Sequence, residues 1–233
     1  MLTDLGLLFI IRKAVQYYYS YAGRTRMADF KGIAEALIEG NADKVKDLVQ
    51  AAVDENVGLQ KVLDQGLIAG MEVVGVRFKN CEIYVPEVLV SARAMSAGME
   101  ILEPLLAKQG IKARGTFVLG TVKGDLHDIG KNLVGMMLKG QGWKVVDLGV
   151  DIDAEKFVES AIKEDADVIG LSALLTTTMV NMKGVIELAK TKDCKSKIIV
   201  GGAPLTKSYA DEIGADGYAP DAATAVEIVQ SFV

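Results

Sequence analysis

The chain has 233 residues, half of them hydrophobic, and a formal net charge of −5 at pH 7. This length allows one large domain or two small ones with an ample core. The mildly acidic balance, without a basic run, argues against nucleic acid as the main partner. Cys81 and Cys194 are the two cysteines and lie in no metal-binding spacing, which indicates a reducing cytoplasm without a disulfide framework.

The first 26 residues differ in pattern from the rest of the chain. The apolar run Leu7–Ile11 is too short to span a bilayer. Positive charges at Arg12 and Lys13 follow this run, which is the reverse of a signal peptide. We expect the natural start at Met27, with residues 1–26 as an upstream extension. The alternative is a short extra helix that packs on the body or mediates association.

Apolar residues recur at helical spacing from Phe30 to about Gln109. Together with the segment Gly32–Glu39, these faces predict a four-helix bundle over residues 28–110. The polar, glycine-bearing segment 108–115 that follows is the predicted linker. The apolar faces comprise Val45, Leu48, Val49 and Ala52, then Leu59, Val62, Leu63, Leu67, Met71 and Val74, then Val88, Leu89, Ala92, Met95, Met99 and Leu102.

Residues 114–233 alternate between short apolar runs and helical patterns. The alternation predicts a five-stranded, doubly wound parallel sheet of the flavodoxin or Rossmann-like type. The fold class is therefore α plus α/β. The predicted strands are Gly115–Gly120, Lys144–Leu148, Asp167–Leu171, Lys197–Val200 and Gly217–Ala219, and the helices between them include Ala154–Lys163 and Met179–Lys190.

His127 is the only histidine and lies in the loop after the first predicted strand. Asp125 stands two residues earlier, where its carboxylate can accept the imidazole N–H and leave the other ring nitrogen free as a metal ligand. Gly124 and Gly130 flank the loop and suit a close approach of backbone to a large ligand. One histidine with one aspartate is too few for a structural zinc site. A metal here is expected to arrive with its other ligands in place, as in a macrocycle; the alternative is a histidine that satisfies only a local hydrogen bond.

The stretch Asp125-Leu-His127-Asp-Ile-Gly130 resembles the Asp-x-His-x-x-Gly signature of cobalamin-binding domains that bind B12 base-off and His-on. In that family the histidine replaces the cofactor's own dimethylbenzimidazole as lower ligand of cobalt. Ser-x-Leu and Gly-Gly elements follow at fitting distances, and the helical segment is similar to the cap domain of methyltransferase corrinoid proteins and of methionine synthase. The resemblance covers residues 28–233. It implies that the chain binds cobalamin, as methylcobalamin, hydroxocobalamin or a related corrinoid, with His127 as the cobalt ligand.

The resemblance also implies where the rest of the cofactor lies. Ser172, Leu174 and Thr176 would line the slot for its nucleotide tail, with Gly201 and Gly202 at the flank. In methionine synthase a serine extends the Asp–His pair, and one candidate for the matching position is Thr178. The alternative on the residues alone is that the Gly-Gly pair is only a tight turn and that the threonines are only helix caps. The family's final loop corresponds here to Tyr218, Asp221 and Ala222.

Tyr84 and Val85 fall on the family's cap segment. By resemblance they shield the upper face of the corrin when no partner enzyme is docked, which protects a reactive cobalt centre from water and oxidants. The linker that follows the cap would then act as a hinge. The alternative is that Tyr84 is a plain core aromatic residue.

The function implied is that of a cobalamin-carrying subunit, inactive alone, in an anaerobic methyltransferase system. A donor-specific methyltransferase would deliver a methyl group to Co(I). A second methyltransferase would pass it to a thiol such as coenzyme M or to tetrahydrofolate, and a reductive activation protein completes the expected partners. We expect a cytoplasmic protein with neither nucleic acid nor membrane as partner. Two alternatives are a B12-dependent sensor or regulator and the cobalamin-binding subunit of a mutase.

Overall fold

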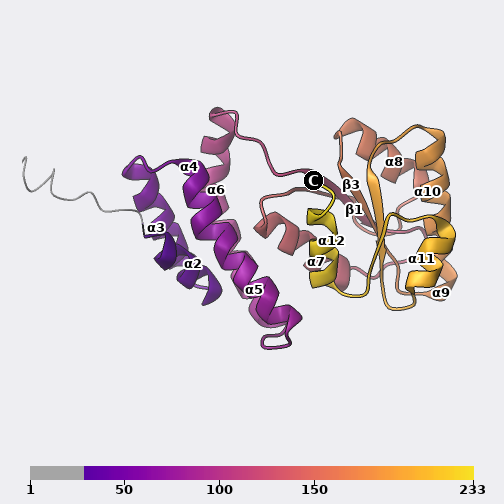
Figure 1. The fold of residues 1–233 in the computed structure, drawn as a ribbon, viewed down its shortest axis with the longest axis horizontal. Helices are drawn as coiled ribbons and strands as arrows, with labels where there is room; N and C mark the ends of the chain where they lie inside the picture. The colour runs from indigo at the N-terminus through magenta and orange to yellow at the C-terminus, as the bar shows by residue number, and fades with distance from the viewer. Residues whose placement is uncertain (1–28) are drawn as a thin grey trace, which may run out of the picture.

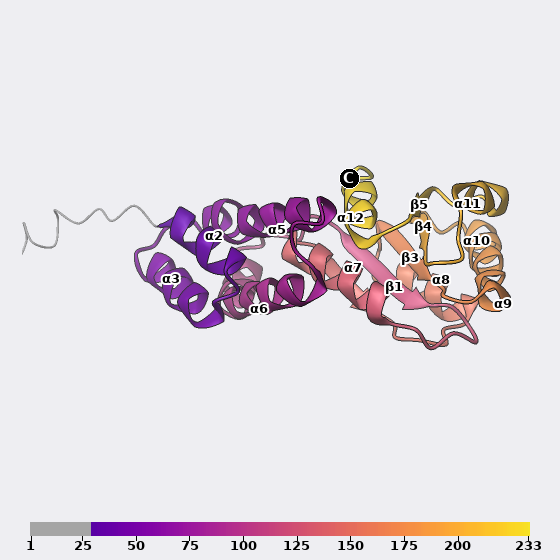
Figure 2. The same cartoon turned by 90° about the horizontal axis from the view of Figure 1, so that it is seen from below.

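The computed structural model describes residues 29–233, and the predicted extension at residues 1–26 lies outside the described residues. A helical half is followed by a five-stranded sheet with helices on both faces (Figures 1 and 2). The predicted α plus α/β fold class is confirmed. Within residues 29–233, no helix has both the length and the apolar character needed to cross a membrane.

The first two helices of this half begin where side chains satisfy free backbone N–H groups. The Asp29 carboxylate accepts from Gly32 N–H at 2.8 Å, and the Asn41 side chain accepts from Lys44 N–H at 3.0 Å. A π-helical segment, η1, interrupts one continuous helical run between α4 and α5. The elements are α2 (Phe30–Ile38), α3 (Ala42–Asp54), α4 (Leu59–Lys61), η1 (Val62–Ile68), α5 (Ala69–Lys79) and α6 (Val85–Lys108).

The sheet is parallel throughout, in the order β2-β1-β3-β4-β5. Because side chains alternate along a strand, Phe117 and Leu119 of β1 enter one core and Val118 enters the other. The five strands are β1 (Thr116–Thr121), β2 (Lys144–Asp147), β3 (Val168–Ser172), β4 (Lys197–Gly201) and β5 (Gly217–Ala219).

Two helices of the second half cover one face of the sheet, and the remaining four helices of that half pack on the opposite face (Figure 2). The first pair is α7 (Ile129–Gly140) and α12 (Ala222–Gln230), which pack against each other. The opposite face carries α8 (Ala154–Lys163), α9 (Thr176–Met179), α10 (Asn181–Thr191) and α11 (Lys207–Ile213).

This strand order has a switch point between its central neighbours, β1 and β3. The chain leaves β1 toward β2 on one side, and it continues from β3 toward β4 on the other side. The loops after β1 and β3 therefore diverge and leave a crevice at the carboxyl ends of the two strands, where open α/β sheets bind their ligands. The loop after β1, residues 122–128, carries His127.

The helical half packs against α7 and α12, the two helices that cover one face of the sheet (Figures 1 and 2). One apolar cluster runs through both halves. Gly140 permits a close approach, because a Cβ atom there would lie 2.9 Å from Cε of Met71. At the rim of the contact, Lys79 forms an ion pair with Glu227 at 2.6 Å. The join is thus mainly apolar packing, with charge at its edge.

Candidate functional site

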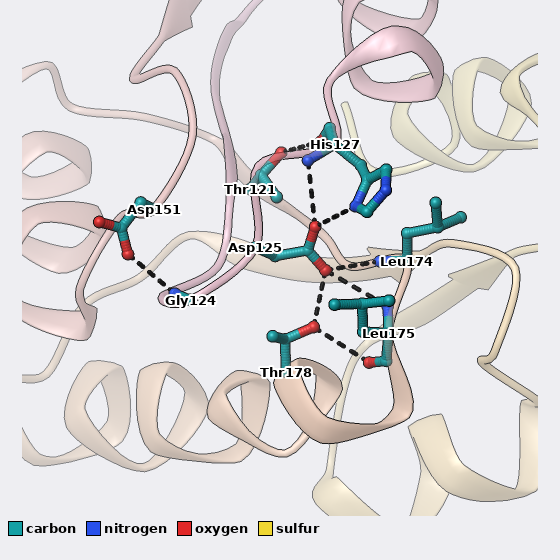
Figure 3. Close-up of polar contacts among 8 residues, drawn as sticks. All are labelled: Thr121, Gly124, Asp125, His127, Asp151, Leu174, Leu175 and Thr178. Atoms are coloured by element: carbon teal, nitrogen blue, oxygen red, sulfur yellow. Dashed lines mark hydrogen bonds and ion pairs between the residues drawn. The ribbon is translucent and has the colours of Figure 1, made fainter.

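The carboxylate of Asp125 is fully buried in the loop after β1 and accepts hydrogen bonds on both oxygens (Figure 3). Its Oδ2 accepts from the Thr178 hydroxyl at 2.6 Å, from Leu174 N–H at 2.8 Å and from Leu175 N–H at 3.3 Å. Its Oδ1 accepts from the backbone N–H of His127 at 3.1 Å and lies 2.7 Å from Nδ1 of the same residue. One carboxylate therefore joins the loops after β1 and β3.

These contacts set the charge of Asp125. Burial by itself raises the pKa of this carboxyl, but hydrogen bonds from Thr178, Leu174 and His127 together outweigh it and hold the pKa well below its usual range. The group is ionised at neutral pH and can only accept. The proton of the neutral imidazole of His127 is therefore on Nδ1, which leaves the lone pair of Nε2 free to bind a metal.

The backbone of the loop holds this pair in place. The Thr121 hydroxyl donates to the carbonyl of His127 at 2.8 Å. Gly124 has a φ of +81°, a left-handed conformation that suits glycine. Its N–H donates to the Asp151 carboxylate at 2.8 Å, and the Asp151 N–H donates back to the carbonyl of Asp125 at 3.0 Å. The side chain of His127 is 52% exposed, so its free nitrogen is accessible.

A cavity of about 500 Å³ opens beside His127, between α7 and α12 on one side and the ends of β1, β3 and β4 on the other. Phe78, at the end of α5, contributes the wall from the helical half. The predicted site residues that line the cavity are His127, Gly130, Ser172, Leu174, Gly201, Gly202, Asp221 and Ala222. Asp125 and Thr178 lie behind His127. Asp125 contacts His127 directly, and Thr178 contacts Asp125.

Besides Asp125 and Thr178, four further predicted residues are not in the wall of this cavity. Thr176 opens α9 and is exposed, and the Tyr218 hydroxyl donates to the carbonyl of Leu205 at 3.0 Å. Tyr84 is 67% exposed at the start of α6, so it is not a core aromatic residue in this arrangement. Val85 is partly buried against the apolar core. Their role toward a cofactor remains a prediction.

Sequence reasoning missed three kinds of residue in the site. Phe78 comes from α5, about fifty residues before His127, and only the packing of the two halves brings it to the cavity. Lys131 lines the cavity too, although its side chain is almost fully buried. Its Nζ donates to both carboxylate oxygens of Asp147 at 2.7 Å and to Asn132 Oδ1 at 2.6 Å. The apolar strand residues of the wall have the sequence pattern of ordinary core residues, so nothing in the sequence marked them as part of a site.

The donor set fits a metal that brings other ligands with it. Among residues 29–233, no group of three or more His, Cys, Asp or Glu side chains is placed to hold a metal ion. His127 offers one imidazole nitrogen, with its carboxylate partner behind it, and the cavity beside it has room for part of a bulky group. This arrangement suits a macrocycle-bound metal and not a free ion held by the protein alone.

Comparison with known families gives matches to both halves of the chain. One family model, described as a B12 binding domain, matches residues 115–227. A second, also described as a B12 binding domain, matches residues 30–103.

Individual proteins show the same similarity. The chain is 48% identical to a corrinoid protein of Desulfitobacterium hafniense strain Y51 over 206 residues, which cover 86% of this chain and 95% of the relative. It is 44% identical to dimethylamine corrinoid protein 3 of Methanosarcina acetivorans, with 86% and 96% covered. Among solved structures, it matches a chain of the methanol:cobalamin methyltransferase complex of Methanosarcina barkeri with a TM-score of 0.80 and 30% identity, over 99% of this chain and 92% of that one.

Proposed function

Because this chain belongs to the family of corrinoid proteins of methyltransferase systems, we propose that it binds its corrinoid base-off and His-on, with Nε2 of His127 as the lower ligand of cobalt. The observation that carries this proposal is the 2.7 Å contact between Nδ1 of His127 and the ionised Asp125. It leaves the second ring nitrogen free beside a cavity that can take the displaced base.

Each neighbouring group has a part in holding the cofactor. Asp125 fixes the tautomer and orientation of the imidazole, and Thr178 fixes Asp125 through a 2.6 Å hydrogen bond. In this proposal Thr178 takes the part that a serine has in methionine synthase. Ser172, Gly201 and Gly202 line the mouth of the cavity, where the ribose and phosphate of the nucleotide tail would lie. The bound corrinoid supplies a cobalt centre that carries a methyl group.

The proposed partners are two methyltransferases and a reductive activation protein, all in the cytoplasm. Relatives named dimethylamine corrinoid proteins, at 42 to 44% identity, make dimethylamine the first methyl donor to test. The acceptor in this proposal is a thiol such as coenzyme M, or tetrahydrofolate. The chain itself transfers no methyl group without its partner enzymes.

The cap remains part of the proposal. Tyr84 and Val85 would shield the corrin once the helical domain, residues 28–110, swings over the cobalamin-binding domain, residues 114–233. The exposed position of Tyr84 is consistent with a side chain that has its contact only in that other arrangement.

The unique histidine allows a direct test of the lower ligand. Protein without a histidine tag is prepared with histidine labelled with the heavy nitrogen isotope of nuclear spin one-half, loaded with cobalamin and reduced to Co(II). Coordination by His127 predicts that each line of the electron paramagnetic resonance spectrum splits into a doublet. Coordination by the cofactor's own unlabelled base would give triplets and overturn the proposal.

A variant supplies the control for this measurement. His127→Gly removes the ligand, so the doublet should vanish, and free labelled imidazole should restore it by occupying the space that the side chain leaves. If His127→Gly keeps the wild-type spectrum, His127 is not the ligand. Failure of the wild-type protein to take up any corrinoid would refute the function as a whole.

A further inference from the structure

The cavity beside His127 is polar at its mouth and apolar in its depth. The polar side chains in its wall all lie near the carboxyl edge of the sheet. Two of them come directly before α7 and one lies in the first turn of α7. One is the last residue of β3, and one is the N-cap of α12. They are His127, Asp128, Lys131, Ser172 and Asp221. Further back along the strands and helices the wall is hydrocarbon and glycine, made by Phe117, Leu119, Gly170, Ile199, Leu133, Val134 and Ala225.

The polar groups at the mouth are poorly placed to hydrogen-bond a ligand in the depth, because several of them already form hydrogen bonds within the protein. Both carboxylate oxygens of Asp221 accept from Thr224, each at 2.8 Å. Lys131 uses its three donors on Asn132 and Asp147. Ser172 is the last residue of β3, so its hydroxyl stands at the edge.

The backbone of the deep wall is engaged as well. Phe117, Leu119 and Ile199 lie in register with residues of β3 within the parallel sheet, so their peptide groups belong to the ladder. Among the described residues, the buried side-chain polar atom without a hydrogen-bond partner is Nε1 of Trp143, which does not line the cavity. The depth therefore presents a ligand with little but carbon.

Resting on the function proposed above, we propose that this depth selects the lower base of the corrinoid: it accepts a benzimidazole and discriminates against a purine. A benzimidazole attached to its ribose has one free ring nitrogen. An adenine attached in the same way adds two further ring nitrogens and an amino group. Each polar group that is buried without a hydrogen bond loses its hydration without compensation, so the purine is disfavoured.

The lining of the depth suits an aromatic ring system. Small residues stand on the side of β5 and α12, where Ala219, Ala222 and Ala225 line the cavity. Leu133 and Val134 of α7 line it too, on the helix that packs beside α12 (Figure 2). An aromatic ring bound between these two helices and the sheet would bury apolar surface on both of its faces, which favours its binding.

The test is a direct competition. Limiting protein is mixed with equal amounts of cobalamin and of its counterpart with adenine as lower base, and the retained corrinoids are separated and counted after ultrafiltration. Both are kept in the Co(I) state under a chemical reductant, because Co(I) carries no lower ligand and neither base has to be removed from cobalt. We expect cobalamin to be retained in about tenfold excess or more, the ratio that follows from one buried polar group left unpaired.

A pair of matched variants assigns the preference to the cavity. Val134→Thr adds a hydroxyl to the wall at nearly constant volume and should reduce the excess of cobalamin severalfold. Val185→Thr makes the same change in α10, on the opposite face of the sheet and outside the cavity wall, and should leave the ratio as in the wild type. The wild-type ratio stands on its own even if a variant fails to fold.

The outcomes separate this inference from the function on which it rests. Binding of neither corrinoid would refute the proposed function. Equal retention of the two corrinoids would leave the function standing and overturn the base selectivity. Cobinamide, which has no lower base, provides the last arm: if it competes as well as cobalamin, the base does not enter the cavity and the inference fails.

Discussion

The two places where separate parts of the chain meet are built in opposite ways. At the carboxyl edge of the sheet, the loops after β1 and β3 meet through short, directional hydrogen bonds on the single carboxylate of Asp125 (Figure 3). Where the helical half meets the sheet, the contact is apolar, with Met71 against Gly140 and an ion pair at the rim. Directional bonds specify the position of a ligand atom, whereas apolar packing joins two bodies without specifying a single arrangement.

This difference suits the proposed function. A metal ligand has to stay in one orientation, which the Asp125 network provides. A domain that has to move away for a partner enzyme is better held by contacts that can slide and separate. The comparison predicts that the sheet edge is sensitive to small changes of polarity or backbone, and the contact between the halves to changes of volume.

The largest effect is expected at Gly202. Its φ is +135°, and a Cβ atom there would lie 1.8 Å from the carbonyl oxygen of Ala173. Strain and overlap together should lower the free energy of unfolding of Gly202→Ala by about 3 kcal/mol or more, measured by urea denaturation. Gly149→Ala is the control, because φ is +91° but the space is open, and it should cost about 1 kcal/mol. Equal losses would show that the crowding at Gly202 is not what limits substitution.

Met71→Ala should come next. It deletes a buried side chain from the contact between the halves, and the cavity left behind should cost about 3 kcal/mol. The variant should also be cut faster by trypsin in the linker at Lys112 and Arg114, because the halves hold together less well. Met182→Ala, in the core on the other face of the sheet, should cost as much stability without faster cleavage there. The same cleavage rate in both variants would contradict the role of Met71 in the contact.

Thr178→Val tests the network at the sheet edge with almost no change of volume. It removes the 2.6 Å hydrogen bond to the buried, ionised Asp125 and should lower the free energy of unfolding by about 2 kcal/mol. Thr178→Ser keeps the hydroxyl and should stay within about 0.5 kcal/mol of the wild type. If valine and serine behave alike, the hydroxyl does not hold Asp125.

The smallest effect is expected for the ion pair at the rim. The Lys79 and Glu227 side chains are 49% and 53% exposed, so water and salt screen their attraction. Lys79→Gln should change the free energy of unfolding by about 0.5 kcal/mol or less. A double-mutant cycle with Glu227→Gln measures the coupling, and a value well above that figure would mean that charge holds the halves together more than packing does.

Much of the architecture was predictable from local pattern. The helix Ala154–Lys163 and the first residue of β2 at Lys144 agree with the structure, since periodicity and polar flanks mark both. The predicted helix Met179–Lys190 corresponds to α10, which begins two residues later, at Asn181, because Met179 is the last residue of the short helix α9. The π-helical segment η1 was not foreseen, since a short stretch of wider helical turn hardly alters the apolar pattern of the run from Leu59 to Val74.

The pair Asp125 and His127 could be identified from the sequence by itself, because two residues of spacing are enough to bring a carboxylate to an imidazole within one loop. The sequence also determined the parallel sheet, whose alternating strands and helices allow few other arrangements. Only the tertiary structure decided that Leu174, in the loop after β3, and Thr178, in α9, donate to Asp125, and that Phe78 reaches the cavity from the helical half. These contacts join residues that are some fifty positions apart, and what brings them together is the packing of whole elements, which no local pattern records.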